Sequence, residues 1–248
     1  MKSSVSPHII LTLVLAVVAM ATQARAQDTL VLKDNTRRDG EIMGVANGQV
    51  KIKIGPVQTS VPLDSVVSAV KPAPKAFDDI LATWQTGDGN KTLALLQPFV
   101  QNYRGLPTQW AERASALLGE VNLTLNQIPA AEAAFADFQK AYPNSSSLTA
   151  IGLARLAVAK KDFAGAKTRL QPILVEADKV TIAPAGKSAT YGQAFYLMGL
   201  VNESENNNSE ALRDYLSTVT LFYEDKAVVS KAQERADVLM KDKQVIVP

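Results

Sequence analysis

The hydrophobic pattern changes once along the chain, from a period of two to a period of three to four. Between residues 27 and 70, apolar and polar side chains alternate, most clearly at Val50, Ile52 and Ile54. This alternation is typical of half-buried strands. From residue 76 onward, apolar positions recur every three or four residues, which indicates helices with one buried face. The sequence therefore predicts a small β unit followed by a larger part that makes the fold mainly α.

The β unit is expected to contain five short strands, at residues 30–32, 41–45, 50–54, 58–62 and 66–70. Asn47-Gly48 favours a tight hairpin because both residues tolerate positive φ, and Gly55-Pro56 interrupts the third strand. Five strands in so short a stretch resemble a small Sm-like or SH3-like β-barrel. The resemblance implies a closed barrel over residues 27–70.

Residues 71–75, Lys-Pro-Ala-Pro-Lys, predict a short linker, because two prolines stiffen the backbone. Few contacts are expected to cross such a linker. We therefore expect the β unit and the helical part, residues 76–248, to fold separately.

The helical part is expected to form helices at residues 76–86, 90–103, 108–125, 129–141, 147–160, 163–177, 188–205, 208–223 and 226–241. Leu96-Gln97-Pro98 recurs as Leu170-Gln171-Pro172, which places each proline inside the second helix of a pair. The long connection at residues 178–187 is interpreted as slack, with a lip over a groove or an insertion as alternatives. The last helix has no partner helix in the sequence and is expected to be a polar cap, and residues 241–248 are expected to fray.

Small residues recur at a fixed spacing along the helical part. Gly119 and Ala131 are twelve residues apart, and so are Gly199 and Ala211. Small side chains allow two helix backbones to approach closely, and Phe135 fills the space beside the first pair. This order, in a unit of about 34 residues, resembles the tetratricopeptide repeat. The resemblance implies a TPR-like solenoid of about three to four helical hairpins plus a capping helix. An irregular helical domain is the alternative.

The same resemblance implies a groove lined by the first helix of each hairpin. The positions that it assigns to this groove are Arg113, Glu120, Arg155, Gln193, Tyr196 and Glu203. Their mixed charges indicate a polar groove suited to a protein or peptide partner. The alternative interpretation is that they are ordinary solvated surface.

The first 26 residues have the features of a signal peptide. Lys2 precedes an apolar run at residues 9–19, and Ala24-Arg25-Ala26 supplies small residues two apart. We expect cleavage before Gln27 and a periplasmic or secreted protein. Because a spanning helix needs about 20 apolar residues, no stable membrane span is expected after cleavage. An uncleaved anchor is the alternative.

Removal of this leader restricts the available chemistry. The chain has no Cys, and its single His is His8, inside the leader. The mature chain therefore lacks histidine bases, cysteine nucleophiles and metal sites built from either residue. Without Lys2 and Arg25, the 26 basic residues fall to 24 and balance the 24 acidic ones. This balance gives no electrostatic footprint for nucleic acid.

These observations favour a non-catalytic exported scaffold or adaptor, with no cofactor and no metal. The repeat half resembles periplasmic repeat proteins, and this resemblance implies a role in cell-envelope organisation. The alternative is a regulatory subunit of an envelope enzyme that recognises carbohydrate or peptidoglycan. A third class is an enzyme that uses only Asp, Glu, Ser, Lys or Tyr, since glycoside hydrolysis, for example, needs just two carboxylates. The partner is expected to be a protein or peptide, and a homo-oligomer stays open.

Overall fold

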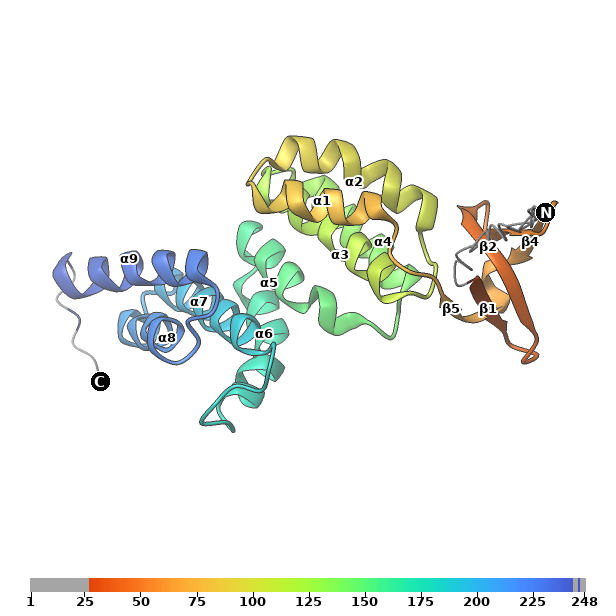
Figure 1. The fold of residues 1–248 in the computed structure, drawn as a ribbon. Coiled ribbons are helices and arrows are strands. Elements are labelled where there is room, and N and C mark those ends of the chain that lie inside the picture. The colour runs from red at the N-terminus through yellow and green to blue at the C-terminus, as the bar shows by residue number, and fades with distance from the viewer. Residues whose placement is uncertain (1–26, 243–244, 246–248) are drawn as a thin grey trace, which may run out of the picture.

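The computed structural model describes residues 27–242 and Val245 (Figure 1). The predicted signal peptide, residues 1–26, and most of the predicted frayed end lie outside the described residues. Within the described part, a small sheet is followed by helices, and the sheet and the last helix lie at opposite ends of the molecule. The prediction of a mainly α fold with an N-terminal β unit is confirmed.

The sheet is antiparallel and follows the order β4-β3-β2-β1-β5. Its strands are β1 (Asp28–Leu32), β2 (Arg37–Ala46), β3 (Gln49–Ile54), β4 (Val57–Pro62) and β5 (Val66–Val70). Asn47 and Gly48 both have positive φ, 53° and 69°, and form the predicted turn between β2 and β3. The five strands are where the alternation placed them, except that β2 begins four residues earlier than residue 41.

The sheet is open, so the prediction of a closed β-barrel is wrong. Strands β4 and β5 are its two edges, and they do not pair with each other in the described residues. A barrel closes only when its edge strands share backbone hydrogen bonds. Here the chain crosses from one edge to the other through one 3₁₀ turn, η1 (Leu63–Ser65). The carbonyl of Ser65 accepts a hydrogen bond from the Lys33 amide at 2.8 Å, which fixes this turn.

The linker is shorter and more firmly held than the sequence predicts. Helix α1 (Lys75–Gln85) begins at Lys75, which leaves residues 71–74 as the connection. The Lys71 ammonium pairs with the Asp28 carboxylate at 2.8 Å, and the Lys71 carbonyl accepts a hydrogen bond from the Trp110 indole at 2.8 Å. The linker is therefore attached at its first residue to both the sheet and the helices.

The sheet and the first helices share one hydrophobic core. Leu30 and Ile52 from the sheet belong to the same buried cluster as Phe99, Leu106 and Trp110. The Asn102 side-chain amide also donates to the Met43 carbonyl of β2 at 3.4 Å. These contacts join the sheet to the first helices, and separate folding of the two parts stays a prediction.

The remaining helices are α2 (Gly89–Tyr103), α3 (Gln109–Thr124), α4 (Ile128–Ala141), α5 (Ala150–Ala159), α6 (Phe163–Ala177), α7 (Ser188–Ser204), α8 (Asn208–Thr220) and α9 (Lys226–Asp242). Their bounds lie within three residues of those predicted. The largest differences are at the end of α8 and at the start of α5, which is preceded by a 3₁₀ helix, η2 (Ser146–Thr149). Helices α1 to α8 pair as four hairpins in chain order, and none of the described helices is long and apolar enough to cross a membrane.

The four hairpins share one turn conformation. The residue two positions before the second helix of each pair is left-handed: Gly87, Asn126, Lys161 and Asn206 have φ between 56° and 81°. In the last three turns, the next amide donates to a carbonyl five residues earlier at 2.8–2.9 Å. This bond closes the end of the first helix. We call Gly87, Asn126, Lys161 and Asn206 the turn residues, and counting from them aligns the hairpins.

Packing inside each hairpin follows this alignment. The residue five positions after the turn residue is fully buried, as in Thr92, Ala131, Ala166 and Ala211. A Cβ atom added to Gly119 would lie 2.4 Å from the Phe135 ring, and one added to Gly199 would lie 2.5 Å from the Tyr215 ring. The predicted close approach at both glycines is confirmed, and the neighbour is an aromatic ring of the second helix.

Helix α9 forms no hairpin of its own in the described residues and covers the last hairpin instead. It packs on α7 and α8 and buries Ala232, Ala236 and Leu239. Its outer face carries exposed polar residues such as Lys231 and Glu234. The helix therefore combines a buried inner face with the polar outer face expected of a cap.

Candidate functional site

The six residues predicted to line a groove all lie on first helices, namely α3, α5 and α7. Helix α3 contacts α5, α5 contacts α7, and α7 contacts α9. The first helices therefore follow one another as a continuous row, and we call this surface the first-helix row. Arg113 is exposed, and the other five residues are half-buried in it.

Glu120 of α3 and Arg155 of α5 form an ion pair across this row. Burial raises the pKa of the Glu120 carboxyl above its ordinary value, and the nearby Arg155 guanidinium opposes that rise. The structure therefore brings two of the predicted residues together and uses their charges within the chain.

A second contact network joins α7, α8 and α9. The Glu203 side chain is 10% exposed and accepts hydrogen bonds from two Arg235 nitrogens, at 3.1 and 2.5 Å, and from the Tyr215 hydroxyl at 3.0 Å. Burial and the adjacent carboxylate raise the pKa of Tyr215. The Tyr196 ring lies 5.9 Å from the Tyr215 ring, centroid to centroid, and burial raises its pKa as well. The sequence missed Arg235 because α9 was expected to be only a cap.

The two remaining predicted residues differ from each other. Gln193 donates to the Asp225 carboxylate at 2.7 Å, so its amide is also used within the chain. Arg113, at the corresponding position of α3, makes no hydrogen bond or ion pair with any residue that the structure describes. Of the six, Arg113 and the half-exposed face of Tyr196 are therefore the groups best placed for an external partner.

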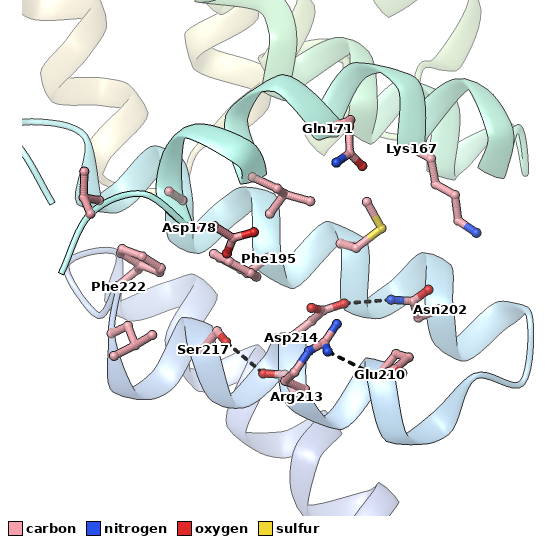
Figure 2. A pocket seen from close by; sticks show the side chains of 15 residues that line it. Lys167, Gln171, Asp178, Phe195, Asn202, Glu210, Arg213, Asp214, Ser217 and Phe222 are labelled. Carbon is pink, nitrogen blue, oxygen red and sulfur yellow. Dashed lines mark hydrogen bonds and ion pairs between the residues drawn. The ribbon is translucent and has the colours of Figure 1, made fainter. Parts of the chain in front are cut away.

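A cavity of about 730 Å³ lies on a different surface, between α6, α7 and α8 (Figure 2). We call it the α6–α8 trough. Its apolar wall includes Leu174, Phe195, Met198 and Phe222. Its polar side chains include Lys167, Gln171, Asp178, Asn202, Glu210, Arg213 and Asp214. Apolar wall and convergent polar groups are the usual composition of a ligand pocket.

Asp214 is the unusual member of this set because its side chain is only 4% exposed. One carboxylate oxygen accepts a hydrogen bond from the Asn202 amide at 2.8 Å, as Figure 2 shows. Burial raises the pKa of Asp214 to about 6, against the opposing effects of Asn202 and Arg213. The sequence held one signal for this site: Asp214 falls between Ala211 and Thr218 on the stripe that α8 buries.

Replacing Asp214 by asparagine is expected to stabilise the protein at high pH. The folded-state pKa, about 6, exceeds the ordinary 3.8, so ionised Asp214 opposes folding above pH 6 and ceases to do so as the pH falls towards 4. The gain in unfolding free energy for Asp214→Asn is about 2–3 kcal/mol at pH 8 and vanishes near pH 4. Urea unfolding of both proteins from pH 4 to pH 8 measures it. Parallel curves across that range would contradict the prediction.

Among the described residues, no group of three or more His, Asp or Glu side chains could hold a metal ion. Comparison with protein families, curated proteins and solved structures gives no match to this chain. The site therefore has to be interpreted from its own geometry.

Proposed function

We propose that the protein is an exported, non-catalytic adaptor of the cell envelope, built from TPR-like helical hairpins, which binds a protein or peptide partner along its first-helix row. The observation that supports this proposal is the continuous contact of α3, α5, α7 and α9. Stacked hairpins of this kind present an extended surface to a partner, as helical repeat proteins do.

The ion pairs on the first-helix row support recognition of a partner by side chains that are held in fixed positions. Glu120–Arg155 and Glu203–Arg235 fix the helices relative to one another, so that side chains between them are held in place. Arg113 and Tyr196 then offer a cation and an aromatic ring, two groups that are enriched at protein interfaces. A partner is expected to contact both.

A photo-cross-linking residue placed at position 113 or 196 tests this function in the native cell. We expect each to give a covalent adduct with the same protein. The same residue at Gln97, which is exposed on the second helix α2, is the matched control and is expected to give no such adduct.

Equal adducts from positions 97, 113 and 196 would contradict the choice of surface. Absence of adducts from both row positions, together with retention of the purified protein on peptidoglycan, would instead favour a carbohydrate-recognising subunit.

A further inference from the structure

The α6–α8 trough has a counterpart two hairpins earlier in the array. A cavity between α2, α3 and α4 is lined by residues at the same positions relative to the turn residues. Val100 and Leu174 each lie thirteen residues after a turn residue, and Leu118 and Met198 each lie eight residues before one. The earlier cavity measures about 30 Å³ and the trough about 730 Å³. The same place in the repeat is therefore closed in one copy and open in the other.

An ion pair spans the closed copy. Arg104, at the end of α2, pairs with Asp137 of α4 at 2.6 Å. The corresponding positions in the open copy are Asp178 and Ser217, which cannot form this bridge. The trough thus lacks the guanidinium that lies over its counterpart, and it has a carboxylate in that position instead.

The charge of the trough also differs from that of the closed copy. Asp214 and Ala134 both lie eight residues after a turn residue, so the trough gains a buried carboxylate where the closed copy has a methyl group. Arg213 pairs with Glu210 at 3.6 Å, and Lys167 with Glu205 at 2.5 Å. Within the described residues, neither Asp178 nor Asp214 has an ion pair. The trough therefore carries unneutralised negative charge beside an apolar wall.

The geometry points to the α6–α8 trough as a binding site for a basic peptide segment, which inserts a lysine side chain between α6 and α8 and places its ammonium on Asp214 and Asp178. The inserted cation would bridge α6 and α8, as Arg104 bridges α2 and α4 in the closed copy. The aliphatic stem of lysine suits the wall formed by Phe195 and Met198, because long basic side chains bury their methylene groups along apolar surface. This inference rests on the proposed adaptor function and adds a second contact surface for a partner of the same class.

The affinity of the trough for a lysine side chain is expected to depend on pH. The charged groups that act on Asp214 are Asp178, directly after α6, and Glu210 and Arg213 of α8, while Asn202 of α7 supplies a neutral amide. Lys167 of α6 also lines the trough, but its ammonium pairs with Glu205. A cation binds the ionised carboxylate, and a group whose pKa is about 6 is ionised in only about one molecule in ten at pH 5. Affinity for the lysine peptide is therefore expected to fall about tenfold from pH 8 to pH 5.

A titration of the purified protein, residues 27–248, tests the site. The probe is the acetylated, amidated peptide Ala-Leu-Lys-Leu-Ala, and its matched control carries acetyl-lysine, which keeps the stem and removes the charge. NMR signals of the Met198 methyl group and the Asn202 side-chain amide report binding at the trough. We expect saturable shifts with the lysine peptide and at least tenfold weaker binding of the acetyl-lysine peptide.

Two variants assign the effect to the trough. Asp214→Asn is expected to bind the lysine peptide at least tenfold more weakly than wild type, with only the preference that Asp178 supplies, and its stability measurement separates lost binding from lost folding. Asp178→Arg supplies an internal cation and is expected to weaken binding of the lysine peptide at least tenfold. Equal affinity of wild type for both peptides, an undiminished lysine preference in Asp214→Asn, or no saturable shift at millimolar peptide would overturn the inference. Because the probe is added to isolated protein, these outcomes are independent of the cross-linking result at positions 113 and 196.

Discussion

Replacing Gly199 by leucine is expected to lower the free energy of unfolding of the last hairpin by about 3 kcal/mol. A Cβ atom added at this position would lie 2.5 Å from the Tyr215 ring, which is fully buried and hydrogen-bonded to Glu203. Because the ring is fully buried, the larger side chain is expected to push α7 away from α8. Overpacking of a filled core typically costs about 1–3 kcal/mol and sometimes more.

Hydrogen exchange locates this damage. Repeat stability is close to a sum of single units and nearest-neighbour contacts, so α7, α8 and α9 are expected to lose protection while α3 and α4 keep it. Ser209→Leu adds the same side chain at an exposed position of α8 and is expected to change stability by less than about 0.5 kcal/mol. The double variant Gly199→Ala with Tyr215→Leu imitates Ala154 and Leu170 of the third hairpin and is expected to be more stable than Gly199→Leu. Unchanged exchange in Gly199→Leu would show that the alignment of the hairpins is wrong.

Replacing Trp110 by alanine is expected to cost about 3–5 kcal/mol and to weaken the sheet and the first helices together. The indole ring contacts Phe77, Phe99 and Tyr103, with centroid separations of 6.5, 5.7 and 4.9 Å. Its N–H also holds the Lys71 carbonyl of the linker. Its loss therefore removes packing among α1, α2 and α3 and releases the connection to β5.

Amide exchange in β1 and β5, compared with that in α1 to α3, measures whether the two parts respond together. Trp84→Ala is the matched control, because Trp84 is half-buried in the same cluster but lies near the opposite end of α1. We expect it to cost less and to leave the strands protected. Loss of protection in the helices alone after Trp110→Ala would mean that the sheet is stable without them.

Local patterns in the sequence were sufficient for the secondary structure. Alternation at Val50, Ile52 and Ile54 defined β3, and the spacing of Gly119 from Ala131 identified the packed face of a hairpin. Local patterns could not predict whether the sheet closes into a barrel. Closure depends on whether the edge strands β4 and β5, which η1 connects, pair with each other. The contact of Trp110 with the linker was also missed, since the two segments lie 39 positions apart.

The functional surfaces were predicted less completely. The repeat pattern placed Glu120, Arg155 and Glu203 on first helices. The ion pairs that these side chains form could not be predicted, because they depend on how neighbouring helices stack. The α6–α8 trough was missed because its difference from the α2–α4 copy comes from single substitutions at aligned positions, Asp178 for Arg104 and Asp214 for Ala134. Aligning the hairpins by their turn residues is what makes these differences visible.

The attachment of Lys71 has a mechanical consequence. A four-residue linker that was free would stretch under tension and absorb the load before either neighbour felt it. Here its first residue is held by Asp28 on one side and Trp110 on the other, and side chains of α2 contact β2 beside it. A force applied to the sheet is therefore transmitted directly into α2 and α3. The sheet is therefore expected to move together with the first helices and not to swing on a flexible linker.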